Sequence, residues 1–301
     1  MKKEIGFIGL GKMGMAMVNR LLKKKWRVVA YDINPQASLS AKRRGAVEAV
    51  NPKELAEKLS SQKIVFLMVP AGKPVDQALF GKQGLMHVLK KGDIVIDGGN
   101  SFFKDSRRRA VRLKKKGIYY LDTGISGGPV SIKQGKFAIM VGGEKRVFEK
   151  IQPLFRALSD TIPGYMGKSG AGHFAKMIHN GIEYGMMQAL AEGFSILKKS
   201  SFNFHLQDVA QVYSQNSIIT SRLVNWLKQG FEEYGENLKK ASFNVAHTGE
   251  GEWTVKTAKE LKVPVPVIKS AFNFRIQSKK KSSFTGRILS TLRAVFGGHK
   301  I

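Results

Sequence analysis

The chain has 301 residues, of which 43% are hydrophobic and 24% are charged, and its formal net charge at pH 7 is +29. The length is that of two ordinary globular domains, and no apolar run approaches the roughly 20 residues of a membrane-spanning helix. The sequence contains no cysteine, which excludes disulfides and thiolate metal sites. We expect a cytoplasmic protein without a secretory leader.

The excess of positive charge is concentrated in two segments. Residues 104–116 carry eight Lys or Arg and one acid, and residues 256–301 carry eleven against the single acid Glu260. Such charge either attracts anions, such as phosphorylated metabolites or nucleic acid, or forms an ordinary solvated surface. We favour the solvated surface, because the basic residues are spread along predicted helices, and we expect any nucleic-acid binding to be nonspecific.

The N-terminal segment predicts a dinucleotide-binding unit. Residues 5–8 and 26–31 form apolar strands, and a helix between them is introduced by the pattern G-x-G-x-x-G. The first glycine allows the turn, the second admits the pyrophosphate, and the third lets helix and strand pack closely. Free N–H groups at the start of the helix then bind the phosphates. The cofactor contacts expected from this turn are Gly9, Leu10, Gly11, Lys12, Met13 and Gly14.

Asp32 ends the second predicted strand, 23 residues after the first glycine. An acid at this place binds the ribose hydroxyls and repels the additional phosphate of NADP. Ile33 follows, where an NADP enzyme more often has Arg, so we favour NAD and disfavour NADP. An alternative role for Asp32 is to cap the helix that starts near Pro35, and the two roles are compatible.

Short apolar runs at 63–69, 93–99 and 117–128 predict further buried parallel strands. Each run ends in turn-forming residues, and ligands of an open α/β sheet bind at the carboxyl ends of its strands. Turn formation alone explains any one of these segments equally well, but three at one edge favour a site. The cofactor candidates are Val69, Pro70, Ala71 and Asn100, and the substrate candidates are Asn100, Ser126, Gly127 and Gly128.

The second half predicts helices. A helix over 142–155 and a short strand over 161–167 precede a long periodic segment without proline, which runs from about Ala171 to Lys199. Further helices are expected over 206–215, 218–231, 254–261, 266–279 and 285–296. We therefore predict an α/β Rossmann-type domain over 1–167 and an all-α domain for substrate binding and dimerisation over 168–301.

The long predicted helix carries an unusual polar stripe. Four polar residues occupy positions i, i+3, i+4 and i+7, which share one face of a helix: Lys176, His179, Asn180 and Glu183. Three interpretations of such a stripe are a buried structural network, a solvent-facing surface and a set of catalytic groups. Apolar neighbours argue against simple exposure: Phe174, Met177, Ile178 and Ile182. Because burial tunes amines and carboxylic acids for proton transfer near neutral pH, we favour acid–base catalysis by this stripe.

Four segments together resemble the decarboxylating 6-phosphogluconate dehydrogenase family over nearly the whole chain. They are GLGKMG (9–14), DGGN (97–100), SGG (126–128) and GAGHFAKMIHNGIEYG (170–185). The chain resembles the short form of this family in its length and in having Asp32 after the second strand. The short form is associated with NAD. The wider β-hydroxyacid dehydrogenase superfamily shares the glycine motif and the helical lysine but not H-N-G-x-E-Y-G. An enzyme acting on a small unphosphorylated 3-hydroxy acid is therefore the alternative.

The resemblance implies an activity and a role for each matched residue. The activity is oxidative decarboxylation of 6-phospho-D-gluconate to D-ribulose 5-phosphate, a step of the pentose phosphate pathway and of gluconate utilisation. Lys176 would be the base that takes the 3-hydroxyl proton, and Glu183 the acid that protonates C1 of the enediol. His179 and Asn180 would act in the catalytic site and bind substrate, together with the strand-end residues. The resemblance implies no metal.

The resemblance also assigns the ligands of the substrate phosphate. They would be Tyr184 and Arg275, joined by Arg293 from the C-terminal pattern R-x-x-F-G-x-H, which ends in His299. In relatives this tail reaches the neighbouring subunit's site, so a dimer or tetramer is expected, and a frayed terminus is the alternative. Thr248 stands where the long form of the family has a phosphate-binding Lys. The short-form pattern is similar to this loop, so we interpret the difference as a variant and not as a broken site.

Overall fold

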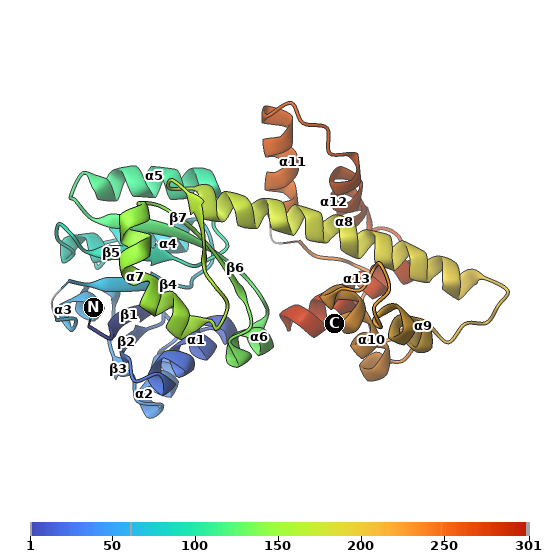
Figure 1. Ribbon diagram of the computed structural model, residues 1–301, viewed down its shortest axis with the longest axis horizontal. Coiled ribbons are helices and arrows are strands. Elements are labelled where there is room, and N and C mark those ends of the chain that lie inside the picture. The colour runs from blue at the N-terminus through green and yellow to red at the C-terminus, as the bar shows by residue number, and fades with distance from the viewer. Residues whose placement is uncertain (1, 61, 248, 299–301) are drawn as a thin grey trace. The chain divides into compact units, whose positions relative to one another are not determined.

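The computed structural model describes residues 2–60, 62–247 and 249–298, and the chain divides into two compact units, Met1–Lys176 and Met177–Ile301 (Figure 1). The division falls inside helix α8 (Ala171–Lys199), so the domain boundary predicted after residue 167 stays a prediction. Within the described ranges, no helix is long and apolar enough to cross a membrane.

The first unit contains an eight-stranded sheet with the order β3-β2-β1-β4-β5-β6-β7-β8. The strands are β1 (Glu4–Ile8), β2 (Arg27–Tyr31), β3 (Val47–Glu48), β4 (Ile64–Leu67), β5 (Ile94–Asp97), β6 (Tyr119–Ser126), β7 (Ala138–Gly142) and β8 (Gly164–Gly167). All neighbours pair in parallel except β6 and β7, which are antiparallel. The carboxyl ends of β1, β2, β4, β5 and β6 therefore share one edge, as the sequence predicted.

Helices cover both faces of this sheet. They are α1 (Lys12–Lys23), α2 (Pro35–Arg43), α3 (Pro52–Glu57), α4 (Lys73–Phe80), α5 (Phe103–Lys114), α6 (Pro129–Gln134) and α7 (Lys145–Leu158), with a 3-10 turn η1 at Leu85–His87. Alternate residues of β1 enter different cores. Phe7 packs with Met17 of α1 and Leu154 of α7, whereas Ile8 packs with Leu55 of α3 and Leu79 of α4. Burial on both faces explains why the strands are continuous apolar runs.

The second unit is helical where it is described, so the predicted fold class is confirmed. It contains the rest of α8, with α9 (Leu206–Tyr213), α10 (Arg222–Tyr234), α11 (Glu250–Glu260), α12 (Pro266–Gln277) and α13 (Phe284–Gly297). Helix α10 packs against α9 and α13, and the core includes Phe194, Phe231 and Leu289.

Two helices of the second unit start elsewhere than the sequence pattern predicted. Helix α10 begins at Arg222 and not at 218, because the Ser221 hydroxyl accepts the N–H of Val224 at 3.2 Å and caps the helix. Helix α11 begins at Glu250 and not at 254. Gly249 precedes it with φ 104°, a left-handed conformation that glycine adopts without steric cost.

Candidate functional site

The glycine turn joins β1 to α1 with a different role for each glycine. Gly9 has φ 97°, and a Cβ on Gly14 would lie 2.0 Å from the carbonyl oxygen of Gly9. A Cβ on Gly11 would meet no atom within 4 Å, so the space beside this backbone is open to a ligand. The N-terminus of α1 follows at Lys12. A turn, an open approach and a helix N-terminus together fit the pyrophosphate of a dinucleotide.

Asp32 holds the glycine turn against the end of β2. One carboxylate oxygen accepts the N–H of Leu10 at 2.5 Å, and the other accepts the N–H of Asn34 at 2.8 Å. The alternative role of Asp32 as a helix cap is wrong, because the Asn34 side chain caps α2 by accepting the N–H of Gln36. Asp32 stays half-buried, and Ile33 beside it is 88% exposed. A carboxylate and an apolar side chain at this strand end give an NADP phosphate no cation.

The other predicted cofactor-binding residues, and the substrate candidates of the first unit, lie at the carboxyl ends of three neighbouring strands. Val69, Pro70 and Ala71 follow β4, Asn100 follows β5, and Ser126, Gly127 and Gly128 end or follow β6. Pro70, Asn100 and Lys12 are exposed, whereas the others, with Met13, are half-buried. The structure thus brings these segments to one edge of the sheet in the first unit.

A buried carboxylate that the sequence analysis did not select organises the turn after β5. Asp97 has no exposed surface, and one of its oxygens accepts the N–H of Gly99 at 3.1 Å. The other oxygen accepts the hydroxyls of Ser101 at 2.9 Å and Tyr120 at 2.6 Å. Burial raises the pKa of Tyr120 well above its ordinary value, and the Asp97 charge raises it further, so the phenol remains a donor.

Arg109 of α5 connects this turn to the one after β4. Its side chain is fully buried, with Nη1 3.6 Å from the Asp97 carboxylate. Nε donates to Asp76 at 2.9 Å, and Nη2 donates to the carbonyl of Gly72 at 3.0 Å. The prediction of a solvated basic surface over 104–116 is therefore wrong at Arg109. Burial alone would lower its pKa, but Asp76, Tyr120 and Asp97 outweigh burial and raise it.

The four stripe residues of α8 are all half-buried. His179 Nδ1 lies 3.0 Å from the amide oxygen of Asn180 and 3.7 Å from the carboxylate of Glu183, one helical turn away. A protonated imidazole would therefore pair with Glu183. The expected apolar flanks are only partly present, because Met177 is buried but Ile182 is 53% exposed. Lys176 is the last residue of the first unit, and the other three belong to the second.

Two buried guanidinium groups gather around Tyr184 in the second unit. Arg275 is 2% exposed, and its Cζ lies 3.4 Å from the centre of the Tyr184 ring. Its Nη2 lies 3.5 Å from the sulfur of Met187. Arg293 is half-buried and interacts electrostatically with Tyr184 and with Glu250. We call Tyr184, Arg275 and Arg293 the arginine cluster.

In the described ranges, neither arginine of the cluster forms an ion pair, although Glu250 interacts electrostatically with both and Glu183 with Arg275. Across the ranges that the structure covers, no carboxylate lies within 4.0 Å of the nitrogens of Arg275 or Arg293. Burial lowers the pKa of both guanidinium groups, and burial also raises the pKa of Tyr184. A buried cation without a carboxylate in direct contact is costly, so this arrangement favours binding of an anion.

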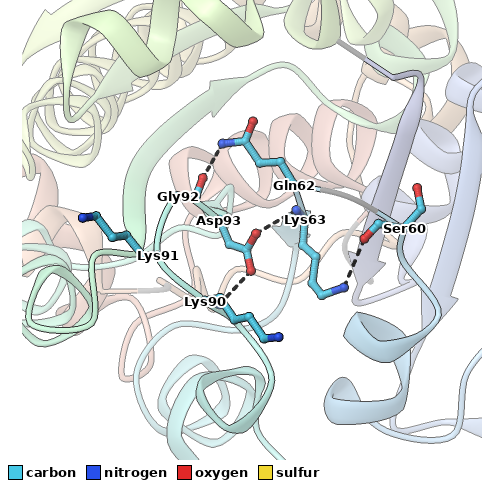
Figure 2. A pocket seen from close by; sticks show the side chains of 7 residues that line it. All are labelled: Ser60, Gln62, Lys63, Lys90, Lys91, Gly92 and Asp93. Carbon is cyan, nitrogen blue, oxygen red and sulfur yellow. Dashed lines mark hydrogen bonds between the residues drawn. The ribbon is translucent and has the colours of Figure 1, made fainter.

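The cavity drawn in Figure 2 lies at the opposite edge of the first unit's sheet, beside the amino ends of β4 and β5. Its volume is about 410 Å³. The ammonium groups of Lys63, Lys90 and Lys91 point in different directions, and Lys63 donates to the carbonyl of Leu59 at 2.8 Å. Asp93 accepts backbone N–H groups of Lys63 and Lys90 at 2.9 and 2.8 Å. The cavity therefore lacks converging cations, unlike the arginine cluster.

Two residues of the predicted site, His299 and Thr248, lie outside the described residues. Among the rest, no group of three or more His, Asp or Glu side chains is placed to hold a metal ion.

Comparisons with known proteins agree with the division of the chain. Residues 4–167 match the family model of the NAD binding domain of 6-phosphogluconate dehydrogenase, and residues 172–287 match that of its C-terminal domain. YqeC of Bacillus subtilis, named as a candidate 6-phosphogluconate dehydrogenase, is 41% identical over 98% of each chain. An NAD(+)-dependent, decarboxylating 6-phosphogluconate dehydrogenase of Haloferax volcanii is 39% identical, over 99% of this chain and 98% of that protein.

A solved structure has the same fold. The 6-phosphogluconate dehydrogenase of Plasmodium falciparum, solved alone, with NADP+ and with 6-phosphogluconate, aligns with a TM-score of 0.77 at 27% identity. The alignment covers 91% of this chain and 62% of that one.

Proposed function

Because the chain belongs to the 6-phosphogluconate dehydrogenase family, we propose that it oxidises and decarboxylates 6-phospho-D-gluconate to D-ribulose 5-phosphate and CO2 with NAD. The arginine cluster is the observation that carries the choice of substrate. A phosphate monoester supplies a directly contacting anion, which Arg275 and Arg293 do not have in the described ranges, and a guanidinium matches its oxygens in a bidentate way.

The alternative substrate is a small unphosphorylated 3-hydroxy acid. Such a substrate has one carboxylate and would leave two buried guanidinium groups without a second anion. The arginine cluster therefore favours the phosphorylated sugar acid.

The proposed chemistry assigns the two proton transfers to the α8 stripe. Lys176 takes the proton of the substrate 3-hydroxyl while the nicotinamide accepts the hydride from C3. The resulting 3-keto acid loses its carboxyl group as CO2, because the ketone accepts the electron pair of the broken bond. Lys176 returns its proton to the ketone oxygen as CO2 leaves, which gives the enediol. Glu183 then gives a proton to C1 of the enediol while Lys176 takes the hydroxyl proton back and the product ketone forms. Transfer of this proton from Lys176 to Glu183 restores both groups. General acid and base groups of this kind contribute about 10²- to 10⁴-fold each.

The remaining predicted residues would hold the substrate. His179 and Asn180 lie within hydrogen-bond distance of each other and present a ring nitrogen and an amide from the same face of α8. Asn100, Ser126, Gly127 and Gly128 would bind hydroxyl and carboxylate groups from the sheet edge. Tyr184 and the two arginines would bind the phosphate.

One spectrophotometric assay tests this function. Purified protein with NAD should reduce the cofactor on 6-phosphogluconate and release one CO2 per NADH, and it should leave gluconate and 3-hydroxyisobutyrate untouched. Lys176→Met should lower kcat at least 10²-fold while NAD still binds. Turnover of the unphosphorylated acids alone would refute the proposed substrate, and unchanged turnover in Lys176→Met would refute the proposed base.

The cofactor preference is tested at one exposed position. Replacing Ile33 adds a cation beside the ribose without removing the hydrogen bonds of Asp32 to the glycine turn. Ile33→Arg should therefore raise kcat/KM for NADP about tenfold, which corresponds to one charge-assisted contact. Ile33→Gln is the uncharged control, and an equal gain in both variants would contradict the electrostatic argument.

The proposal includes self-association, as a dimer or tetramer, and a cytoplasmic location. Arg293 interacts with Tyr184 of its own chain in the structure, whereas the resemblance expects the tail to serve a neighbouring site. Mixing separately inactive Lys176→Met and Arg293→Ala subunits distinguishes these cases. A tail that acts on the neighbour rebuilds one complete site per mixed dimer and restores activity, and a tail that acts within its own chain restores none.

A further inference from the structure

The first turn of α8 rests directly on the backbone of β6 and β7. A Cβ on Gly124 of β6 would lie 2.4 Å from Lys176 Cβ and 2.9 Å from the carbonyl oxygen of Gly172. A Cβ on Gly172 would lie 2.3 Å from the carbonyl oxygen of Asp122 and 2.6 Å from the nitrogen of Gly142. Only hydrogen atoms fit between these backbones, so the stem of Lys176 lies against the α-carbon of Gly124.

Asp122 holds the same turn of α8 by two hydrogen bonds. It is fully buried, and its two oxygens accept the N–H groups of Gly170 at 2.6 Å and His173 at 2.9 Å. N–H groups at the start of a helix have no partner inside the helix, and a carboxylate there also meets the positive end of the helix dipole. Two bonds from one rigid carboxylate restrict both sliding and rotation of the helix start.

A third support comes from α5. The buried ring of His173 lies with Nδ1 2.7 Å from the hydroxyl of Ser106, which has no exposed surface. His173 precedes Lys176 by three residues, so the two side chains leave neighbouring positions of one helical turn. Strand β6 and helix α5 therefore fix the turn that carries Lys176 from two sides.

We propose that Asp122 and Gly124 are positioning residues for Lys176. Asp122 fixes the start of α8, and Gly124 sets how closely the lysine stem approaches β6. The same strand ends at Ser126, two residues beyond Gly124, so β6 sets the distance between the base and this substrate candidate. The inference rests on the proposed role of Lys176 as the base.

Gly124→Ala is the main test. Ordinary contacts between carbon atoms lie near 3.4–4 Å, so a Cβ at 2.4 Å from Lys176 Cβ must displace the stem by about 1 Å. A misplacement of about 1 Å can cost on the order of 10²-fold in rate, and we expect kcat to fall by that factor. The KM for NAD should not change, because the glycine turn is built from β1 and α1. A fold defect alone would lower the amount of active enzyme without this split.

Gly6→Ala is the matched control. Gly6 lies in β1 of the same sheet, and its added Cβ would lie 2.3 Å from Leu55 Cδ2, away from α8. This variant should lose stability yet keep its kcat per folded molecule. Asp122→Asn gives a second readout, because the amide keeps the shape of the carboxylate but retains one acceptor oxygen for two N–H groups. We expect kcat to fall about tenfold in this variant, with KM for NAD unchanged.

The outcomes separate the positioning role from the proposed function. If wild type does not turn over 6-phosphogluconate, or Lys176→Met is fully active, the proposed function fails first. If both behave as proposed but Gly124→Ala and Asp122→Asn match Gly6→Ala in kcat per folded molecule, the positioning role is overturned. A selective loss of kcat in either variant supports it, including the case in which only Asp122→Asn folds.

Discussion

Each unit of the chain contains a buried arginine, and the two arginines differ in the groups that surround them. In the first unit, Arg109 has no exposed surface and lies beside the carboxylates of Asp76 and Asp97. In the second unit, Arg275 is equally buried but faces the ring of Tyr184 and the sulfur of Met187. The first cation is already compensated by contacting carboxylates. In the described part of the chain no carboxylate lies within 4.0 Å of the second, on which Glu183 and Glu250 act only from farther away. The difference separates a structural arginine from one that is prepared for an anionic ligand.

The pKa directions agree with this contrast. Burial alone lowers the pKa of a guanidinium, and at Arg109, unlike at Arg275, the neighbouring acidic groups reverse the effect. A cation–π contact in a desolvated place contributes about 2 kcal/mol, which is less than the several kcal/mol that burial of an ion costs. The Tyr184 ring therefore holds Arg275 in place but does not replace a counter-ion.

The largest expected effect comes from removing the compensated arginine. Arg109→Met leaves Asp97 buried without its cation, and breaking a buried pair in this way costs about 3–5 kcal/mol. Urea unfolding measures the loss. Arg108→Met is the control, because Arg108 also pairs with Asp76 but its side chain is 51% exposed. It should lose no more than about 1 kcal/mol. Equal losses of stability in the two variants would contradict the claim that burial makes the ion pairs of Arg109 more important than those of Arg108.

The same substitution in the second unit should act differently. Arg275→Met removes a buried cation that forms no ion pair with any described residue, so the free energy of unfolding without substrate should be unchanged or higher. The KM for 6-phosphogluconate should rise roughly 10- to 100-fold, as expected for the loss of a hydrogen bond between charged groups worth about 1.5–3 kcal/mol. The KM for NAD is the internal control. A loss of stability as large as that of Arg109→Met would break the comparison.

A ligand that supplies the missing anion should stabilise the second unit. At a concentration of about 100 times its Kd, 6-phosphogluconate should add about 2.7 kcal/mol to the free energy of unfolding. Thermal unfolding of wild type with and without the ligand measures this, with gluconate as the unphosphorylated control. At the same ligand concentration, the gain should fall to about 0.4–1.4 kcal/mol in Arg275→Met, as expected for an affinity that is 10- to 100-fold lower. An equal gain from gluconate would mean that the arginine cluster does not bind the phosphate.

The sequence predicted what depends on residues near one another in the chain. The glycine turn, Asp32 and the α8 stripe are short patterns whose spacing determines which side chains share a turn or a face. Arg109 was hidden because it stands in a basic run, and its partners Asp76 and Asp97 precede it by 33 and 12 residues. Only the sheet order brings these segments together, and no local pattern encodes that order.

The support beneath Lys176 was hidden for the same reason. In the sequence, Asp122 is a single polar residue in a predicted strand. That it accepts the first N–H groups of α8 becomes visible only where β6 and α8 meet in the fold. Capping of α2 was an alternative role for Asp32, and in the structure Asn34 has this role, directly before Pro35. A local signal for Asn34 existed, because Asn is a preferred capping residue.

The smallest expected effect tests whether Asp76 belongs to the compensated pair of the first unit. Burial alone would raise the pKa of Asp76, but hydrogen bonds from Arg109 and Arg108 outweigh burial and lower it below the ordinary value of 3.8. A carboxylate whose pKa is lower in the folded protein contributes stability above its unfolded pKa and loses it as the pH falls through the folded pKa. The contribution of Asp76 should therefore be complete near neutral pH and should decline below about pH 4.

Urea unfolding of wild type and Asp76→Asn over a series of pH values measures this contribution. Because Asp76 is about a third exposed, we expect a difference of no more than about 1 kcal/mol at pH 6. The difference should shrink as the pH falls and the wild-type carboxylate becomes protonated. A difference that stays constant down to pH 3 would mean that Asp76 acts through packing, and not through its charge.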